Sequence, residues 1–134
     1  MTLLYKLTDA NGRTRNATRW GEGVEHTAPG DGQLCTKAWL HAYRHPLLAA
    51  FFNPIHAGFN NPRLWEADGD VGLDDGMKVG CTRLQTLGEM PLPPISTDQR
   101  VEIAIRCAML VCKNPRWTAC AERWLSGKDR TAWT

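Results

Sequence analysis

The sequence contains no long apolar run and no strong excess of charge. No stretch approaches the roughly 18 consecutive apolar residues of a membrane-spanning helix. The formal net charge is only +2, whereas dedicated nucleic-acid-binding proteins usually carry a clear basic excess. A glycine-rich loop ending in Gly-Lys-Ser/Thr is also absent. These absences argue against a membrane span, a nucleic-acid binder and a P-loop nucleotide-binding site.

The sequence also lacks a Cys-x-x-Cys pair and an apolar leader after Met1. The absence of a leader, together with an odd number of cysteines, favours a reducing compartment over secretion. We therefore expect a cytoplasmic protein. The five cysteines are Cys35, Cys81, Cys107, Cys112 and Cys120.

What is present indicates one α+β domain over residues 1–134, long enough to bury a core. Alternation of Leu3, Tyr5 and Leu7 predicts a strand over 3–8 with these side chains on one face. Asn11-Gly12 predicts a tight hairpin that returns along residues 13–20. A glycine-rich loop is expected over 21–33.

The middle of the chain predicts a strand that leads into a helix over residues 34–52. Pro46 suits the first helical turn, and Asn53-Pro54 should end the helix. Trp39, Leu40, Leu47, Leu48, Phe51 and Phe52 are the expected core of this segment. A strand is expected over 63–67, an acidic loop over 68–76, and a second strand over 77–90.

The last third of the chain predicts two helices after a proline-rich connector at 91–95. Ser96 and Gln99 fit a capping box, and a second helix should span 116–126 and end at Gly127. The predicted architecture is a sheet-rich part (1–90) and a helical part (96–134). The sheet should be small and mostly antiparallel, and the helical hairpin should pack on one of its faces.

Three of the four histidines lie close together in the chain, at His41, His45 and His56. With Cys35 they are residue types that bind zinc, but their spacing matches no tight zinc signature. We expect no metal and no cofactor; the alternative is a metal set of Cys35, His41 and His56. A catalytic pairing of Cys35 with one of these histidines is a further alternative. Otherwise His41, Tyr43 and His56 should form a hydrogen-bonded polar cluster.

Charged residues gather in two further places. Arg13, Arg15 and Arg19 alternate with small polar residues, which is typical of a solvated edge strand. Glu66, Asp68 and Asp70 would share one face of an extended chain and could hold a cation, although a solvated acidic turn is the simpler interpretation.

Motifs along most of the chain resemble those of a known family. They are Cys35, Trp39 to Tyr43, Pro46 to Leu48, Asn53 to Ala57, Asn61 to Ala67, Lys78 to Thr82 and Glu122 to Arg130. This pattern, over about residues 34–130, is similar to that of a family of small bacteriophage and prophage proteins to which no activity is assigned. His45 stands where the family pattern has an acidic residue, which argues against an essential ligand there.

The resemblance implies a phage-encoded accessory protein that binds and inhibits a host bacterial protein without catalysis. A defence complex such as a CRISPR effector is the expected kind of partner, as for an anti-CRISPR protein. Aromatic anchors dominate many interfaces, and the chain has six tryptophans. The expected contact residues are Trp20, Arg13, Arg15, Arg19, Asp68 and Asp70.

The alternative function is that of a small enzyme. Tyr5-Lys6 on the first strand and Glu66 on a later one are loosely similar to ADP-ribosyltransferase-like folds. That resemblance implies an NAD cleft in which Glu66 orients the ribose and His41, Tyr43 or His56 binds the nicotinamide end. The sequence departs from that pattern, because it has no Glu-x-Glu motif and no Ser-Thr-Ser strand.

Overall fold

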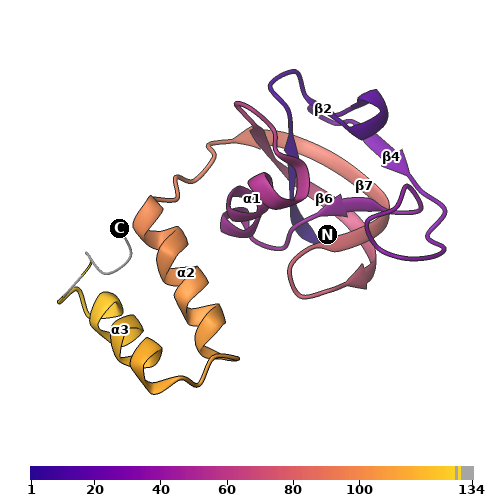
Figure 1. The fold of residues 1–134 in the computed structure, drawn as a ribbon. Helices are drawn as coiled ribbons and strands as arrows, with labels where there is room; N and C mark the ends of the chain where they lie inside the picture. The colour runs from indigo at the N-terminus through magenta and orange to yellow at the C-terminus, as the bar shows by residue number, and fades with distance from the viewer. Residues whose placement is uncertain (129, 131–134) are drawn as a thin grey trace. The chain divides into compact units, whose positions relative to one another are not determined.

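The computed structural model describes residues 1–128 and 130, and the chain forms two compact units, Met1–Pro94 and Ile95–Thr134 (Figure 1). The division falls within the proline-rich connector expected at 91–95. The first unit holds an antiparallel sheet and the second holds two helices. The predicted α+β class is confirmed.

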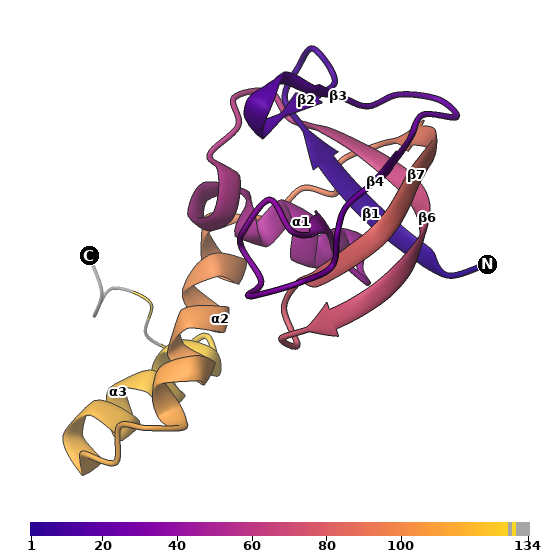
Figure 2. The same cartoon turned by 90° about the vertical axis from the view of Figure 1, so that its right-hand side faces the viewer.

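The sheet is built around one long antiparallel hairpin. Its strands are β6 (Arg63–Asp74) and β7 (Val79–Met90), which pair along most of their length. β1 (Leu3–Thr8) pairs with β6. The short strands β4 (Glu25–Thr27) and β5 (Leu40–Ala42) share the other edge of β7, pairing with residues 83–85 and 79–81 respectively. Figure 2 shows how strongly β6 and β7 curve.

A bridge between Tyr5 and Tyr43 joins the two ends of this sheet. The Tyr5 amide donates to the Tyr43 carbonyl at 2.8 Å, and the Tyr43 amide donates to the Tyr5 carbonyl at 2.9 Å. Because Tyr43 directly follows β5, the path runs from β1 through β6, β7 and β5 back to β1. This closure brings the middle of β1 next to the histidine-rich segment.

The predicted hairpin between residues 3–8 and 13–20 is wrong. The Asp9 carboxylate accepts hydrogen bonds from the amides of Asn11 and Arg13, so the chain turns sharply after β1. The segment then pairs with itself, since β2 (Arg13–Thr14) lies against β3 (Thr18–Arg19) across a short 3₁₀ turn, η1 (Arg15–Ala17). β6 takes the edge of β1 that this segment was expected to occupy.

The acidic loop expected at 68–76 is also wrong over most of its length. Residues 68–74 continue β6, and the turn to β7 comes only after Asp74. Arg83 on the partner strand explains why carboxylates are tolerated in the strand. Its guanidinium forms ion pairs with Asp68 at 3.0 Å, Asp70 at 3.1 Å and Glu25 at 3.0 Å.

The strand-to-helix segment is confirmed, but its helix runs on past the expected end. α1 (Pro46–Phe52) has Pro46 in its first turn, and the Nδ1 atom of His45 caps it by accepting the amide of Leu47. A π-helical turn, η2 (Asn53–Ala57), follows directly. The Asn53 side chain bonds both the amide and the carbonyl of Phe59, which stabilises this turn in place of a stop at Pro54.

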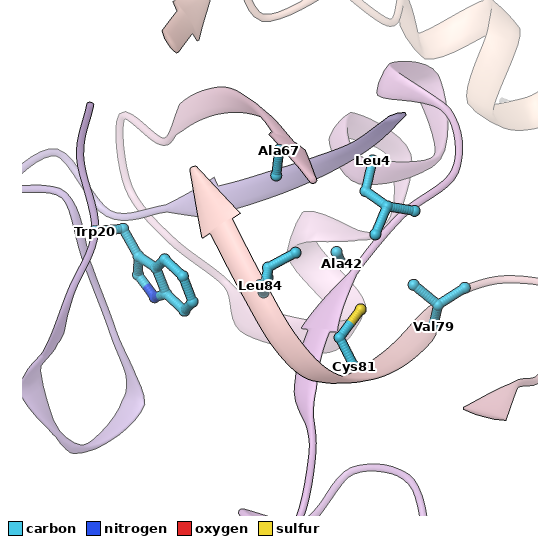
Figure 3. Packing of buried hydrophobic residues seen from close by; sticks show 7 residues of the cluster. All are labelled: Leu4, Trp20, Ala42, Ala67, Val79, Cys81 and Leu84. Carbon is cyan, nitrogen blue, oxygen red and sulfur yellow. The ribbon is translucent and has the colours of Figure 1, made fainter. Parts of the chain in front are cut away.

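Two clusters of buried side chains form the core of the sheet unit. Figure 3 shows the larger one, in which Trp20 and Leu84 lie together with residues of β1, β5, β6 and β7. The smaller one packs α1 against β1 and β6. The expected helix core is partly wrong: Leu47 is 47% exposed, whereas Ala49 is buried, because α1 presents its small side chains to the sheet.

The helical unit begins and ends as the sequence predicts. Ser96 and Gln99 form a capping box before α2 (Thr97–Met109). After α3 (Pro115–Leu125), Gly127 adopts a φ of 80° and its amide bonds the Trp124 carbonyl, while the Lys128 amide bonds the Arg123 carbonyl. This is a Schellman C-cap.

The helical unit has a core of its own, formed by Ile105, Ala121 and Trp124. Packing of this hairpin on a face of the sheet stays a prediction. Within the described part of the chain, no helix is long and apolar enough to cross a membrane.

Candidate functional site: a basic pocket in the sheet unit

A pocket of about 620 Å³ opens beside the closed end of the sheet. Lys6 and Leu7 of β1 line it, as do residues of the β2–β3 segment, the stretch from Cys35 to Tyr43, and η2. The Tyr5–Tyr43 bridge brings these distant segments together. The volume of the pocket lies within the range of about 300–1,000 Å³ typical of small-molecule sites.

The charged side chains that line this pocket are all positive. Among its lining residues are four cationic side chains and two histidines, but no aspartate and no glutamate. The Asp75 carboxylate does not line the pocket, but its negative charge acts to raise the pKa values of Tyr43 and His56. The pocket therefore has a positive potential that would attract anions. The cationic residues are Lys6, Arg15, Lys37 and Lys78.

Lys6 is buried at the inner wall of the pocket. Its side chain shares a face of β1 with Leu4 and Thr8, and only 8% of the residue is exposed. The Nζ atom donates a hydrogen bond to the carbonyl of His41 at 2.6 Å and lies 5.2 Å from the ring centre of Trp20. Burial lowers the pKa of Lys6 to about 8, and the charge of Lys78 acts in the same direction.

Lys78 is the second buried cation of the pocket, with 9% exposure. It lies just before β7, and its amide is held by the Asp75 carboxylate at 2.7 Å. Within the described residues, neither Lys6 nor Lys78 forms an ion pair. Burying a charge without a partner is costly, so both positions favour an anion from outside the chain.

His41 is held in its neutral form within the pocket. Its Nε2 atom accepts a hydrogen bond from the backbone amide of Cys35 at 3.0 Å, which places the ring proton on Nδ1. Burial lowers the pKa of His41 to about 4, and the positive charges of Lys6 and Lys78 contribute. His41 therefore stays uncharged at neutral pH and can serve only as a neutral donor to a ligand.

Tyr43 and His56 form a hydrogen-bonded pair across the pocket wall. The Tyr43 hydroxyl lies 2.6 Å from Nδ1 of His56, and the two rings are stacked with centres 6.0 Å apart. His56 also stacks on Phe52 of α1. Burial raises the pKa of Tyr43 to about 12 and lowers the pKa of His56. Burial thus favours the neutral forms of both groups that share this hydrogen bond.

Two walls of the pocket contain backbone conformations that side chains rarely adopt. Asn16 and Ala17 have φ values of 61° and 55°, and Cys35 has 69°. Left-handed conformations in residues other than glycine cost energy and concentrate at functional sites. Their position in the β2–β3 segment and beside His41 supports the assignment of this pocket as the site.

The predicted polar cluster is only partly formed. Tyr43 and His56 bond each other, but His41 bonds the Cys35 backbone instead. The described residues contain no group of three or more His, Cys, Asp or Glu side chains arranged to hold a metal ion. Cys35, His41 and His56 do line one pocket. However, Nε2 of His41 accepts the Cys35 amide and its proton then lies on Nδ1, so this ring offers a metal ion no free lone pair.

Glu66 does not join the residues that were expected to bind NAD with it. It is exposed on β6 and is not part of the pocket lining, whereas His41, Tyr43 and His56 all belong to that lining. The register places Glu66 opposite Tyr5 on the sheet. The layout expected for an ADP-ribosyltransferase-like cleft is therefore incomplete here.

The expected protein-contact residues are spread over different surroundings. Arg13 and Arg19 are exposed and face each other across β2 and β3, while Arg15 lines the pocket. Trp20 is 4% exposed, and its Nε1 atom donates to Thr14. Asp68 and Asp70 are bound by Arg83. Two contacts, first the Thr2 amide and then Arg83, hold the pKa of Asp68 below its usual range.

Sequence reasoning did not select Lys78 and named Lys6 only beside Tyr5. The signal in the sequence was the position of Lys6 between apolar residues of a predicted strand. In the structure, this strand is buried on both faces from Leu7 onward. The alternation pointed to one face only: Leu7 on that face is buried, but Leu4 on the other face is also fully buried and Leu3 is 46% exposed. Recognition of the second buried face would have placed Lys6 in the core.

Comparisons with protein-family models, with curated proteins and with solved structures gave no match to this chain.

Proposed function

We propose that the basic pocket of the sheet unit binds a small molecule that carries a phosphate or carboxylate group. The observation that carries the proposal is the pair of buried lysines, Lys6 and Lys78, which line the pocket without a carboxylate partner among the described residues. An anionic group between them would supply the missing countercharge.

The rest of the lining supports an organic anion over a bare ion. Leu7, Leu40 and Phe59 contribute apolar surface, and the Tyr43–His56 pair offers hydrogen bonding at the same wall. Pockets for small molecules commonly combine apolar walls with a few placed polar groups. Arg15, on the strained β2–β3 segment, adds a further cation at the pocket.

The proposal is tested by calorimetric titration of the full chain with inorganic pyrophosphate as the probe. Lys78→Met should weaken binding at least about tenfold, which corresponds to about 1.4 kcal/mol. Arg13→Gln is the matched control, because it removes one exposed positive charge outside the pocket lining. Equal weakening by both variants, or no binding by the wild type, would overturn the proposal.

Inhibition of a host protein, which the family resemblance implies, stays a prediction. The tryptophans that were its main support are mostly internal: Trp20, Trp39, Trp65 and Trp124 are each at most 8% exposed. None of these four rings offers the exposed aromatic surface that an interface anchor needs. Pull-down from bacterial lysate with the tagged full chain remains the direct test of that prediction.

A further inference from the structure

Lys6 combines features of a reactive amine with those of an anion-binding lysine. Lys6 lines the pocket, and its Nζ atom is positioned by the His41 carbonyl and the Trp20 ring and forms no ion pair with a carboxylate of the described residues. Lysine is rarely buried in this way without an ion-pair partner. A lysine that only had to attract anions would do so from a solvated position at lower cost in stability.

The surroundings of Lys6 favour the neutral form of the amine, which is the nucleophilic form. Burial removes the water that would stabilise the ammonium ion, and Lys78 adds a second positive charge to the same pocket. Desolvation and a neighbouring cation are the two general means by which lysines are activated for imine formation. With a pKa of about 8, about one tenth of Lys6 is neutral at pH 7.

We propose that Lys6 forms an imine with an anionic aldehyde or ketone bound in the pocket. This inference rests on the proposed anion binding and names the class of ligand as a small phosphorylated or carboxylated carbonyl compound. The lone pair of the neutral amine attacks the carbonyl carbon and a C–N bond forms. The carbonyl oxygen then leaves as water, carrying in net terms both amine protons, so the step needs no oxidant or reductant.

The two lysines then have separate roles. Lys78, with Arg15 from the β2–β3 segment, holds the anionic group of the ligand, and Lys6 reacts with its carbonyl. His41 stays neutral beside them because its Nε2 accepts the Cys35 amide. It therefore adds no further positive charge around the amine at neutral pH.

The test uses pyridoxal 5′-phosphate as an anionic aldehyde, followed by borohydride reduction and peptide mapping of the full chain. Lys6 should be labelled at least about tenfold faster than Lys113, an exposed lysine of the helical unit. Labelling of Lys6 should reach half its maximal rate near pH 8. Lys6→Arg should abolish the rapid phase, and Lys113→Arg should leave it unchanged.

Pyridoxine 5′-phosphate, which has the phosphate but no aldehyde, distinguishes imine formation at Lys6 from anion binding in the pocket. If it binds and protects Lys6 from labelling, both proposals are supported. If it binds while all lysines are labelled at similar rates, the imine is overturned and anion binding stands. If it fails to bind and Lys6 is not labelled selectively, both are overturned. Rapid labelling of Lys6 by unphosphorylated pyridoxal at an equal rate would overturn the anionic requirement.

Discussion

The hydroxyl of Tyr43 and Nδ1 of His56 lie 2.6 Å apart, and this bond links the end of β5 to the π-helical turn η2. Tyr43 is 7% exposed, and its backbone at the same time bridges Tyr5. One residue thus connects the closure of the sheet to the wall of the pocket. Loss of the Tyr43 hydroxyl should lower the stability of the fold and alter the wall of the pocket.

Tyr43→Phe is expected to lower the free energy of unfolding by about 1 kcal/mol, the usual net value of one buried hydrogen bond. Urea denaturation followed by tryptophan fluorescence measures the change. Tyr5→Phe is the control, because Tyr5 is half-buried and its hydroxyl makes no hydrogen bond to the described residues. Equal losses in the two variants would contradict a specific role for the Tyr43–His56 bond.

The buried amine of Lys6 should make stability depend on pH in the alkaline range. Burial lowers its pKa from 10.5 to about 8, so between these values the unfolded chain holds a proton that the folded chain has lost. Stability therefore rises with pH across this window. Relative to Lys6→Met, the wild type should gain up to about 3 kcal/mol, at about 1.4 kcal/mol for each pH unit.

Urea denaturation of the wild type and Lys6→Met at several pH values from about 7 to about 10.5 measures this difference. Comparing the two proteins cancels the contributions of groups that titrate independently of Lys6. A difference in stability that stays constant with pH would mean that the Lys6 amine is solvated in the folded protein.

Gly69 lies where β6 and β7 approach too closely for a side chain. A Cβ atom at this position would lie 2.7 Å from the Arg83 carbonyl oxygen and 3.0 Å from the Leu84 side chain. Gly69→Ala should destabilise the chain by about 1–3 kcal/mol through overpacking. Gly88→Ala on β7 is the control, because nothing lies within 4 Å of its added methyl group. Thermal unfolding compares them, and equal melting temperatures would contradict the close approach.

The capping box of α2 should stabilise the start of the helical unit. Ser96 Oγ accepts the Gln99 amide at 3.1 Å, and the Gln99 side chain accepts the Ser96 amide at 2.8 Å. Ser96→Ala should cost about 1 kcal/mol. Amide hydrogen exchange over residues 97–101 should accelerate in this variant. Thr97→Ala, at the exposed first helical position, should leave exchange nearly unchanged; acceleration of the same size in both variants would count against the cap.

Local chemistry was enough to predict several elements from the sequence. Ser96 with Gln99, Pro46 at a first turn and Gly127 after a helix all act within a few residues, so their roles follow from composition and spacing. The strand 3–8 and the strand-to-helix segment were predictable for the same reason. The α+β class follows from these elements.

Where the prediction failed, contacts between distant residues decided the outcome. Arg83 pairs with Asp68 and Asp70 and allows an acidic stretch to remain in β6. β6 takes the edge of β1 that the predicted hairpin was expected to occupy. No local pattern records either contact, because each depends on where another segment of the chain lies in space.

By itself, the sequence determined the near-neutral charge, the helix caps and the choice of elements, because these depend on residues next to one another. The pocket was decided only by the tertiary structure. Closure of the sheet through Tyr5 and Tyr43 carries Lys6 to the carbonyl of His41 and into a wall shared with Lys78. Two ordinary lysines become a candidate site because burial without a countercharge is a property of the folded chain alone.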